Sequence, residues 1–301
     1  MRVTLVSGRN VAATGVDRYA DAISRALRGL GVEVEERVHR RREWRVLGKP
    51  VGGFASLWAQ RALARRGDAP VLHALDPAVA GRGSDVVTVQ DLLPEEFPGW
   101  FLRSAGDRLN WRLARRYVSR APRVIAASRA TADALVARWE IPRERIRVVH
   151  HGIDAATFHP QDGGHPLLSR DGPTIVYVGD DNPRKNVGLV VRALAALRAR
   201  DGLEPRLVRC GPARFPEVRE AYHADAKAGG VKVVEAGYLP DADLRALLSG
   251  AAAFAWPTLG EGFGFPPLEA MACGTPVIAL DTPVNREVCG PLARYHADEP
   301  Q

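Results

Sequence analysis

The sequence predicts an α/β protein with two doubly wound parallel sheets, and three observations support this prediction. Short apolar runs alternate with segments of helical period along most of the 301 residues. A polar stretch rich in Gly and Pro, at 159–173, interrupts the alternation, and the same pattern then begins again. Because alternating strands and helices form parallel sheets covered by helices, we expect an N-terminal domain at 1–160 and a C-terminal domain at 161–301.

The first half opens with an apolar run that is typical of a buried strand. A glycine turn at Gly15 then leads into a segment whose apolar residues recur at helical spacing and end at Gly31. Ser128 is a plausible N-cap for a later helix, since its hydroxyl can accept a hydrogen bond from the first turn. The predicted strands are 3–7, 32–38, 71–75, 86–91, 123–128 and 146–154, and the predicted helices are 16–31, 103–120 and 130–139.

The second half repeats this construction. Asn186 is expected to cap the first of its helices. Ligands of doubly wound sheets bind beyond the carboxyl ends of the strands, and the motifs described below fall there. The predicted strands are 174–179, 205–211, 231–239, 252–257 and 276–280, the last of which is expected to be the final strand, and the predicted helices are 187–200, 241–251 and 268–273.

Bulk properties indicate a globular protein of the cytoplasm. No apolar run approaches the 18 or so residues that span a bilayer, and the opening MRVTLVSG is too short and too polar to be a signal peptide. Three cysteines are an odd count without metal-ligand spacing, which indicates reduced thiols. We therefore expect no disulfide, no metal site and no redox cofactor.

Positive charge is concentrated in the N-terminal half. Residues 1–160 contain 27 Arg and Lys against 17 Asp and Glu, whereas the remainder contain 15 against 18. Residues 37–66 hold nine of these basic residues and residues 103–123 hold seven. Such surfaces attract anionic partners, and interleaved aromatic residues suit a membrane interface. These aromatic residues are Trp44, Trp58, Trp111 and Tyr117.

Two interpretations of this charge remain open. Peripheral contact with an anionic membrane at the inner face of the cell membrane is one. The other is an arginine-rich composition without a special role, since the chain has 38 Arg and only four Lys. Nucleic acid is not expected as a partner, because no nucleic-acid-binding motif is present.

The segment 256–289 carries the most chemistry. Two carboxylates, Glu261 and Glu269, lie eight positions apart around a turn rich in Gly and Pro. Glycines in this turn let the backbone approach a ligand closely, and the following helix would direct free N–H groups and its positive dipole end at the loop. Glu269 is expected in the first helical turn and Glu261 at the mouth of the loop. Carboxylates beside an anion site suit a nucleotide sugar, although solvated charges on a turn would give the same spacing.

A second candidate lies in the loop YVGDDNPRKNVG at 177–188. Arg184 and Lys185 follow a predicted strand and come just before a helix. Two cations at such a place can neutralise a diphosphate through charge-assisted hydrogen bonds. Lys185 is one of only four lysines in the chain, which favours a functional role over a solvated loop charge.

The Glu-x7-Glu turn, together with EAMACGTPVIA and NREV after it, resembles the signature of retaining GT-B glycosyltransferases of family 4, the group 1 transferases. The resemblance implies a GT-B fold, in which two Rossmann-like domains face a cleft. It implies transfer of a sugar, such as mannose or glucose, from a nucleotide-diphosphate donor to a hydroxyl of a glycan or lipid-linked acceptor. Retention is ascribed in this family to front-face attack, and no metal is expected to assist it.

The resemblance also implies roles for particular residues. Glu269 would accept hydrogen bonds from the ribose, Glu261 would contact a hydroxyl of the donor sugar, and Arg184 with Lys185 would face the diphosphate. The remaining donor-side positions are the loop amides of Gly262, Phe263 and Gly264, the phosphate loop at Gly15, and a base pocket at Gly211, Tyr238 and Leu239.

Three departures from the family pattern keep an alternative open. Gln90 stands where members commonly have a histidine, followed by Asp91, so that Gln90 can bind a sugar hydroxyl but cannot take a charge; Asp91 is expected to be structural. Asp180 stands where many members have an arginine. The C-terminal part is short and is expected to lack the usual final helices. A catalytically impaired or truncated nucleotide-sugar-binding relative is therefore the alternative, and sugar-nucleotide epimerases of the same fold are a weaker one. His150 and His151 are expected to pack in the core or a hinge.

Overall fold

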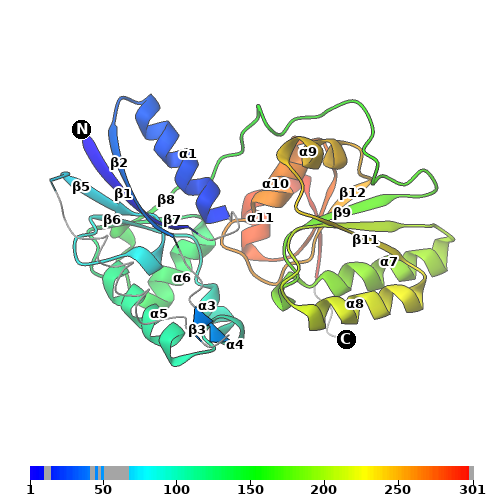
Figure 1. Cartoon of the computed structure of the whole chain (residues 1–301), viewed down its shortest axis with the longest axis horizontal. Coiled ribbons are helices and arrows are strands. Elements are labelled where there is room, and N and C mark those ends of the chain that lie inside the picture. Colours follow the sequence, from blue (N-terminus) through cyan, green and yellow to red (C-terminus); the bar gives the residue numbers. More distant parts are fainter. Residues whose placement is uncertain (10–14, 41–44, 47–48, 51–67, 298–301) are drawn as a thin grey trace. The chain divides into compact units, whose positions relative to one another are not determined.

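The computed structural model describes residues 1–9, 15–40, 45–46, 49–50 and 68–297. The chain divides into two compact units, Met1–His151 and Gly152–Gln301. Each unit contains one six-stranded sheet whose strands all pair in parallel (Figure 1). The two doubly wound α/β units predicted from the alternating pattern are confirmed.

In the N-terminal unit the strand order is β2-β1-β5-β6-β7-β8. The order reverses between β1 and β5, so the helix after β1 and the helices after β6 and β7 lie on opposite faces of the sheet. The strands are β1 Arg2–Arg9, β2 Glu33–Arg40, β5 Val71–Ala74, β6 Val86–Val89, β7 Arg123–Ala126 and β8 Ile146–Val148, and the longer helices are α1 Gly15–Gly29, α5 Ala105–Val118 and α6 Arg129–Trp139.

Short elements complete the N-terminal unit. They are η1 Pro77–Val79, α3 Leu93–Glu96, α4 Pro98–Phe101, η2 Arg143–Arg145 and a small hairpin of β3 Arg45–Val46 with β4 Lys49–Pro50. Ser128 accepts a hydrogen bond from the Thr131 amide at the start of α6, as predicted for an N-cap.

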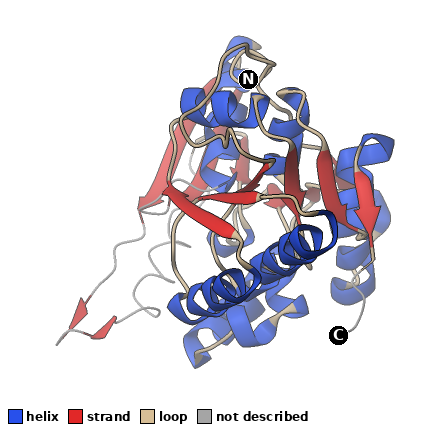
Figure 2. Cartoon of the chain, turned by 90° about the vertical axis from the view of Figure 1, so that its right-hand side faces the viewer, coloured by secondary structure: helices blue, strands red, loops and turns tan. Residues whose placement is uncertain are grey.

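In the C-terminal unit the strand order is β11-β10-β9-β12-β13-β14, with the reversal between β9 and β12. Helices lie on both faces of this sheet (Figure 2), and α7 packs beside α8 (Figure 1). The strands are β9 Thr174–Val178, β10 Arg206–Cys210, β11 Lys232–Gly237, β12 Ala253–Trp256, β13 Val277–Leu280 and β14 Arg294–His296; the helices are α7 Val187–Asp201, α8 Pro216–Gly229, α9 Asp241–Ser249, α10 Phe265–Ala272 and α11 Pro283–Cys289, with short turns η3 Pro183–Lys185 and η4 Gly290–Leu292.

Several elements of the C-terminal unit differ from the prediction. The strand β13 is not the last one, because β14 pairs with its outer edge. The helices α8 and α11 were not predicted: α8 buries only Tyr222 and Ala226, so its apolar period is weak. Asn186 precedes α7 but does not cap it with its side chain; it adopts a left-handed conformation with φ of 51° instead.

The stretch 159–173 is part of the C-terminal unit and packs against its core. Leu167 and Leu168 lie against its hydrophobic core, and the Arg206 guanidinium donates to the Leu167 carbonyl over 3.0 Å. Arg245 on α9 donates to the side chain of Gln161. These contacts order a segment whose composition alone is typical of a linker.

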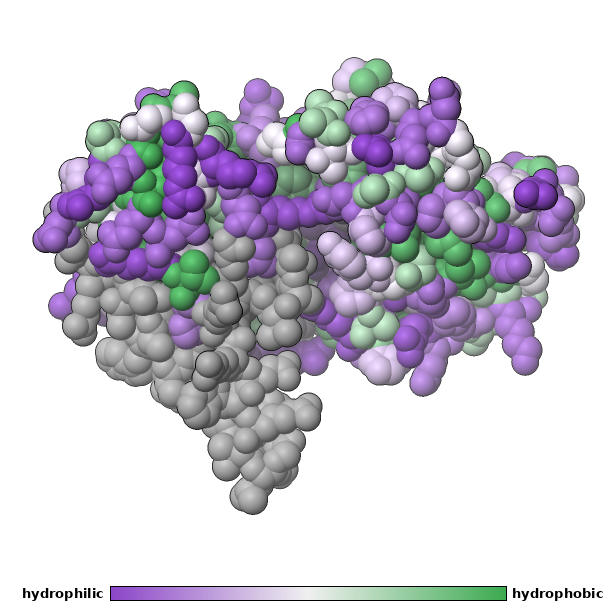
Figure 3. All heavy atoms as spheres, turned by 45° about the horizontal axis from the view of Figure 1, so that its top comes forward, coloured by the Kyte–Doolittle hydropathy of each residue, from purple (hydrophilic) through white to green (hydrophobic). Residues whose placement is uncertain are grey.

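The central strands of the C-terminal sheet form a dry core. Val176 of β9, Leu207 of β10 and Phe254 of β12 are completely buried, and all four residues of β12 are buried. The surface of the face drawn in Figure 3 is mostly hydrophilic, with hydrophobic residues in small patches between charged ones. In the described part of the chain, every helix is too short or too polar to cross a membrane.

Candidate active site

The candidate site lies where the strand order of the C-terminal sheet reverses. Strands β9 and β12 are neighbours, with Phe254 opposite Val176. Because both strands run in the same direction, the loops after them emerge side by side at the carboxyl edge of the sheet. The loop after β9 carries Arg184 and Lys185, and the loop after β12 carries Glu261. Such a reversal is the usual place for ligands in doubly wound sheets.

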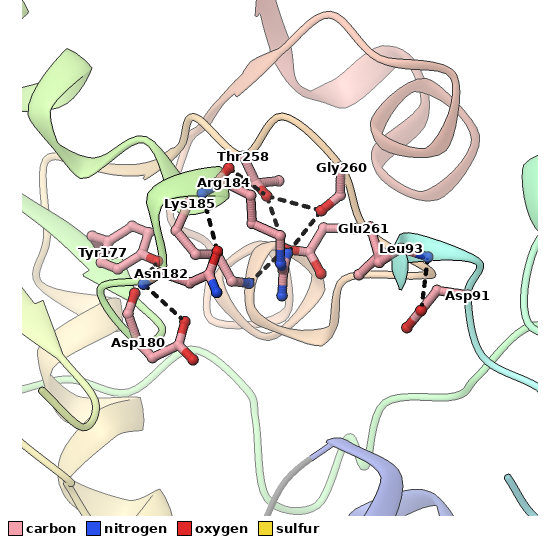
Figure 4. A network of polar contacts seen from close by, with 10 residues as sticks. All are labelled: Asp91, Leu93, Tyr177, Asp180, Asn182, Arg184, Lys185, Thr258, Gly260 and Glu261. Carbon is pink, nitrogen blue, oxygen red and sulfur yellow. Dashed lines mark hydrogen bonds and ion pairs between the residues drawn. The ribbon is translucent and has the colours of Figure 1, made fainter. Parts of the chain in front are cut away.

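Arg184, Lys185 and Glu261 form one ionic cluster (Figure 4). The Arg184 guanidinium lies 2.7 Å and the Lys185 ammonium 2.5 Å from the same carboxylate oxygen, Oε1 of Glu261. The guanidinium also donates to the Gly260 carbonyl over 2.8 Å. Residues 76 and 77 positions apart in the sequence are thereby held together, so the structure joins the two motifs that the sequence presented separately.

The cluster is nearly out of water. The side chains of Arg184, Lys185 and Glu261 are only 12%, 10% and 11% exposed. Burial raises the pKa of the Glu261 carboxyl, but the charges of Lys185 and Arg184 outweigh this effect and bring its pKa below the usual value. Burial lowers the pKa of the Lys185 ammonium; Glu261 opposes that change and Arg184 adds to it. Two cations thus contact one carboxylate, and the charge of Asp180 also raises the pKa of the Lys185 ammonium.

The Trp256 ring lies against the Lys185 ammonium. The Lys185 ammonium lies 4.5 Å from the centre of this ring, a distance at which a cation is attracted to the aromatic face. Trp256 ends β12, is 1% exposed and stacks with Tyr177 of β9 at 6.2 Å. The ammonium therefore has little freedom to move, which suits a group that must meet a ligand in a defined place.

The turn that carries both cations is held by its own side chains. Asn182 accepts from the Arg184 amide, and Pro183 at the start of η3 presets the backbone. Asp180 accepts from the Asn182 amide at 3.4 Å, and its carbonyl accepts from the Tyr177 hydroxyl. The contacts of Asp180 with Asn182 and Tyr177 therefore stabilise the turn that leads to Arg184 and Lys185.

Glu269 lies on α10 and is 3% exposed. The prediction that it belongs to the first helical turn is wrong, because α10 already begins at Phe265. Pro266 and Pro267 follow at once, and a proline has no N–H. Among residues 265–268, only Phe265 and Leu268 therefore carry an amide hydrogen, so the start of α10 offers fewer anion-binding donors than the sequence argument assumed.

The loop amides predicted to face the donor precede α10 directly. Gly264 is the residue before the helix and has φ of +98°, a left-handed conformation that favours glycine. Phe263 is 7% exposed and makes an edge-to-face contact with the Phe265 ring. Gly262 lies next to Glu261, so the loop and the ionic cluster are continuous in the chain.

The residues predicted for the base pocket lie in different environments. Gly211 follows β10, has φ of +137°, and a Cβ at this position would come within 2.3 Å of the Gly179 carbonyl oxygen. Because Gly211 has no Cβ, the backbone after β10 can approach the backbone after β9 closely. Tyr238 follows the edge strand β11 and is 73% exposed, whereas Leu239 packs against the core.

Gly15, predicted for the phosphate loop, begins α1 in the N-terminal unit. The residues just before it, 10–14, lie outside the described residues.

In the N-terminal unit, Gln90 belongs to a polar network at the end of β6. Its side-chain oxygen lies 2.7 Å from Nε2 of His151, and the His151 ring packs on Tyr19 with centroids 4.8 Å apart. The Tyr19 hydroxyl is hydrogen-bonded to the Thr88 hydroxyl, and the His73 ring is hydrogen-bonded to the same hydroxyl. The Gln90 amide nitrogen is buried and has no hydrogen-bond partner among the described residues. The Asp91 carboxylate accepts from the Leu93 amide, two residues further along the chain.

The basic stretches are only partly described. Most of 37–66, including Arg41, Arg42, Trp44 and Trp58, lies outside the described residues. In 103–123 all seven arginines are exposed. The prediction of interfacial aromatic residues is wrong for Trp111 and Tyr117, because both pack against the core of the N-terminal unit and the Trp111 indole donates to Glu95.

Thr258 and Trp256 are the members of the site that sequence reasoning missed. Trp256 reads as the end of a buried strand, and Thr258 as one more turn residue. The signal available in the sequence was their closeness to Glu261, which they precede by five and three positions. The described residues contain no group of three or more His, Cys, Asp or Glu placed to hold a metal ion.

Known proteins match both halves of the chain. Residues 13–157 match the family Glycosyltransferase Family 4, and residues 165–301 match Glycosyl transferases group 1. The D-inositol 3-phosphate glycosyltransferase of Salinispora tropica is 32% identical over 201 residues, which cover 60% of this chain and 42% of that protein. The chain thus spans about two fifths of the length of this relative.

Solved structures share the fold. Sucrose-phosphate synthase from Thermosynechococcus elongatus superposes with a TM-score of 0.74 at 20% identity, covering 99% of this chain and 86% of that one. Anabaena Alr3699/HepE in complex with UDP-glucose gives 0.66 at 17% identity, covering 99% and 85%. The GT-B fold class predicted from the sequence is confirmed. With a family match in each half and the Glu-x7-Glu turn joined to its cation pair, the chain belongs to glycosyltransferase family 4, the glycosyl transferases group 1.

Proposed function

We propose that this chain is a retaining glycosyltransferase, which moves a hexose such as mannose or glucose from a nucleotide-diphosphate sugar to a hydroxyl of a glycan or lipid-linked acceptor. The observation that carries the proposal is the convergence of Arg184 and Lys185 on Glu261 at the reversal point of the C-terminal sheet. Family membership supports it, and so does the UDP-glucose bound to Anabaena Alr3699/HepE.

The cation pair binds the diphosphate and stabilises it as it leaves. Positive charge that is already in place and largely dry is most effective on the negative charge that develops in the transition state. Each well-placed donor contributes on the order of 3 kcal/mol to lowering the barrier. Lys185 and Arg184 supply such donors, and the amides of Gly262, Phe263 and Gly264 add neutral ones near the phosphate and the sugar.

The carboxylates bind the hydroxyl groups of the donor. Glu261 uses Oε1 for its two cations, which leaves Oε2 for a hydroxyl of the donor sugar. Glu269 accepts hydrogen bonds from the ribose. Tyr238 and Leu239 lie beyond β11 and contribute to the base pocket, with Gly211 shaping the neighbouring strand end. The reaction needs no divalent metal.

Gln90 contacts a hydroxyl of the acceptor. Its amide oxygen is already used by His151, so the buried amide nitrogen is the group left to donate. An amide neither gains nor loses a proton at this step. The departing phosphate therefore takes the proton of the acceptor hydroxyl, in the front-face route that family membership implies.

A thermal-shift screen against UDP, GDP, ADP and their sugar conjugates tests the donor site. We expect one nucleotide to raise the melting temperature of the wild type and to have no effect on Glu269→Ala. Lys227→Ala removes an exposed charge from α8 and is the matched control. A folded wild type that responds to none of the nucleotides would contradict the proposal. Binding of the intact donor without turnover on any acceptor would favour a non-catalytic nucleotide-sugar-binding relative.

Contact with an anionic membrane through 37–66 and 103–123 is a second part of the proposal. On α5 the charges of Arg112, Arg115 and Arg116 are exposed, and each basic residue near such a surface contributes about 1 kcal/mol. The triple change of these arginines to Gln is expected to weaken binding to phosphatidylserine vesicles at low salt by about a hundredfold.

A matched triple change in the C-terminal unit is the control for this experiment. Arg170, Arg214 and Arg294 are also exposed, so their replacement by Gln lowers the net charge equally. Equal loss of vesicle binding in both triple variants would show that total charge, rather than α5, is responsible.

A further inference from the structure

Thr258 is buried in the middle of the ionic cluster although the hydroxyl makes it a costly residue there. It lies two positions after β12 and is 0% exposed. Valine has almost the same shape and would fill this space without burying a polar group. A hydroxyl taken out of water destabilises the fold unless it is hydrogen-bonded. A hydrogen-bond acceptor close to the hydroxyl is therefore needed to offset this cost.

The partner is the same oxygen that holds both cations. The Thr258 Oγ1 lies 2.9 Å from Oε1 of Glu261, 3.2 Å from the Gly260 carbonyl and 3.5 Å from the Arg184 carbonyl. A hydroxyl has one hydrogen, and the carboxylate is both the nearest and the only charged acceptor of these three. Figure 4 shows Thr258 beside Glu261 and Arg184 in this network.

Three donors on one oxygen determine how the carboxylate is turned. Arg184 and Lys185 approach Oε1 from the loop after β9, and Thr258 approaches it from the loop after β12. Cations on flexible side chains can follow a carboxylate that rotates, whereas the hydroxyl is on a short, β-branched side chain with a restricted χ1. Thr258 is thus the rigid member that decides which oxygen faces the cations.

We propose that Thr258 is a positioning residue of the donor site: its hydroxyl holds Oε1 of Glu261 toward Arg184 and Lys185 and leaves Oε2 to the ligand. The inference rests on the proposed function for its consequence in transfer. The geometric part concerns Glu261 alone and can be tested without any substrate.

Two variants separate the hydroxyl from the shape. Thr258→Val keeps the shape and removes the hydroxyl, whereas Thr258→Ser keeps the hydroxyl. We expect Thr258→Val to bind the nucleoside diphosphate about tenfold more weakly, since a hydrogen bond to a charged group is lost, and to transfer sugar with a lower kcat. Thr258→Ser is expected within about threefold of the wild type. Thr275→Val removes another buried hydroxyl, which donates to the Leu248 carbonyl, and controls for general destabilisation.

The titration of Glu261 gives a readout that does not depend on activity. The carboxyl groups are labelled with 13C, and Glu261→Gln assigns the signal. The Glu261 signal should titrate at higher pH in Thr258→Val than in the wild type, because the carboxylate has lost a donor, and at an unchanged pH in Thr258→Ser and Thr275→Val.

The outcomes separate the two proposals. A shifted titration in Thr258→Val, in a protein that binds no nucleotide, would support the positioning role and contradict the proposed function. Nucleotide binding and an unshifted titration in Thr258→Val would overturn the positioning role alone. Equal losses in Thr258→Val and Thr258→Ser would show that shape matters and the hydroxyl does not.

Discussion

Lys185 is an ammonium group held largely out of water, with the Glu261 carboxylate beside it and the Trp256 ring below. Burial in this place is costly for a cation, and the surrounding groups offset that cost only in part. A diphosphate that enters the site adds negative charge beside two cations that contact the same carboxylate. The affinity for the ligand therefore draws on this imbalance of direct contacts, two cations to one carboxylate.

Replacing Lys185 tests this imbalance. Lys185→Ala is expected to weaken nucleoside diphosphate binding by about 2 kcal/mol, roughly thirtyfold in Kd, because Arg184 remains to bind the phosphates. Calorimetric titration at low salt measures the change, and Lys227→Ala serves as the matched control. An unchanged Kd in Lys185→Ala would remove the lysine from the donor site.

Gln90 and His151 lead to a prediction for the acceptor. Gln90→Ala removes the donor, and His151→Phe keeps a ring on Tyr19 while removing the nitrogen that orients the amide. Both variants are expected to reduce sugar transfer about tenfold, as the loss of one hydrogen bond implies, and to leave the Kd of the nucleoside diphosphate unchanged. Steady-state transfer rates and calorimetry on the same samples measure the two effects. A loss of nucleotide affinity in either variant would place Gln90 on the donor side.

At the scale of elements, strand ends decide where the loops meet. Gly211 after β10 touches the backbone of Gly179 after β9, and the Gly179 amide donates to the Cys210 carbonyl. The loop that carries Arg184 and Lys185 therefore starts from a fixed backbone contact between neighbouring strands. A side chain at this contact would push the loop away from the sheet.

Gly211→Ala is expected to destabilise the protein by about 2 to 3 kcal/mol, because it combines a left-handed backbone with a Cβ too close to a carbonyl. Gly163→Ala is the matched control: φ is +107° there, but a Cβ would meet nothing within 4 Å. Urea unfolding of both variants separates strain from collision. Equal destabilisation of the two would mean that the contact with Gly179 contributes nothing.

At the scale of the whole molecule, buried neutral histidines link stability to pH. His73 on β5 is 6% exposed and bonded to Thr88, and burial lowers its pKa to about 4. The unfolded chain takes up this proton near the ordinary value of about 6.5. The folded state therefore loses stability as the pH falls from about 6.5 to 4, and loses none above that range.

The expected loss from His73 reaches about 3 kcal/mol at the acid end of this range. At pH 5.0 the loss is about 2 kcal/mol. Urea unfolding at pH 7.5 and pH 5.0 measures it, with His73→Gln as the comparison, since glutamine can reach Thr88 without titrating. His151, whose pKa burial and His150 also bring to about 4, adds to the loss in both proteins. A pH dependence that is the same in the wild type and in His73→Gln would contradict the assignment.

Sequence by itself determined the class of fold and most of its elements. Period-2 and period-3.6 patterns are local, so strands such as Val71–Ala74 and the Ser128 cap of α6 could be recognised from neighbouring residues. The same locality explains the failures. Helix α8 has a weak apolar face, and β14 is a short, mostly exposed edge strand, so neither carries the signal that burial leaves in a sequence.

The candidate residues of the donor site were also local: Glu261, Glu269, Arg184 and Lys185 stood out by motif and by the rarity of lysine. Only the tertiary structure decided what they do together. The strand order placed the loops after β9 and β12 side by side, which brought residues 76 positions apart onto one carboxylate oxygen. It also packed Trp111 against the core, and it placed Trp256 against Lys185 and Thr258 against Glu261. Strand order depends on contacts between segments that are far apart in the sequence, and local patterns of residues do not predict such contacts.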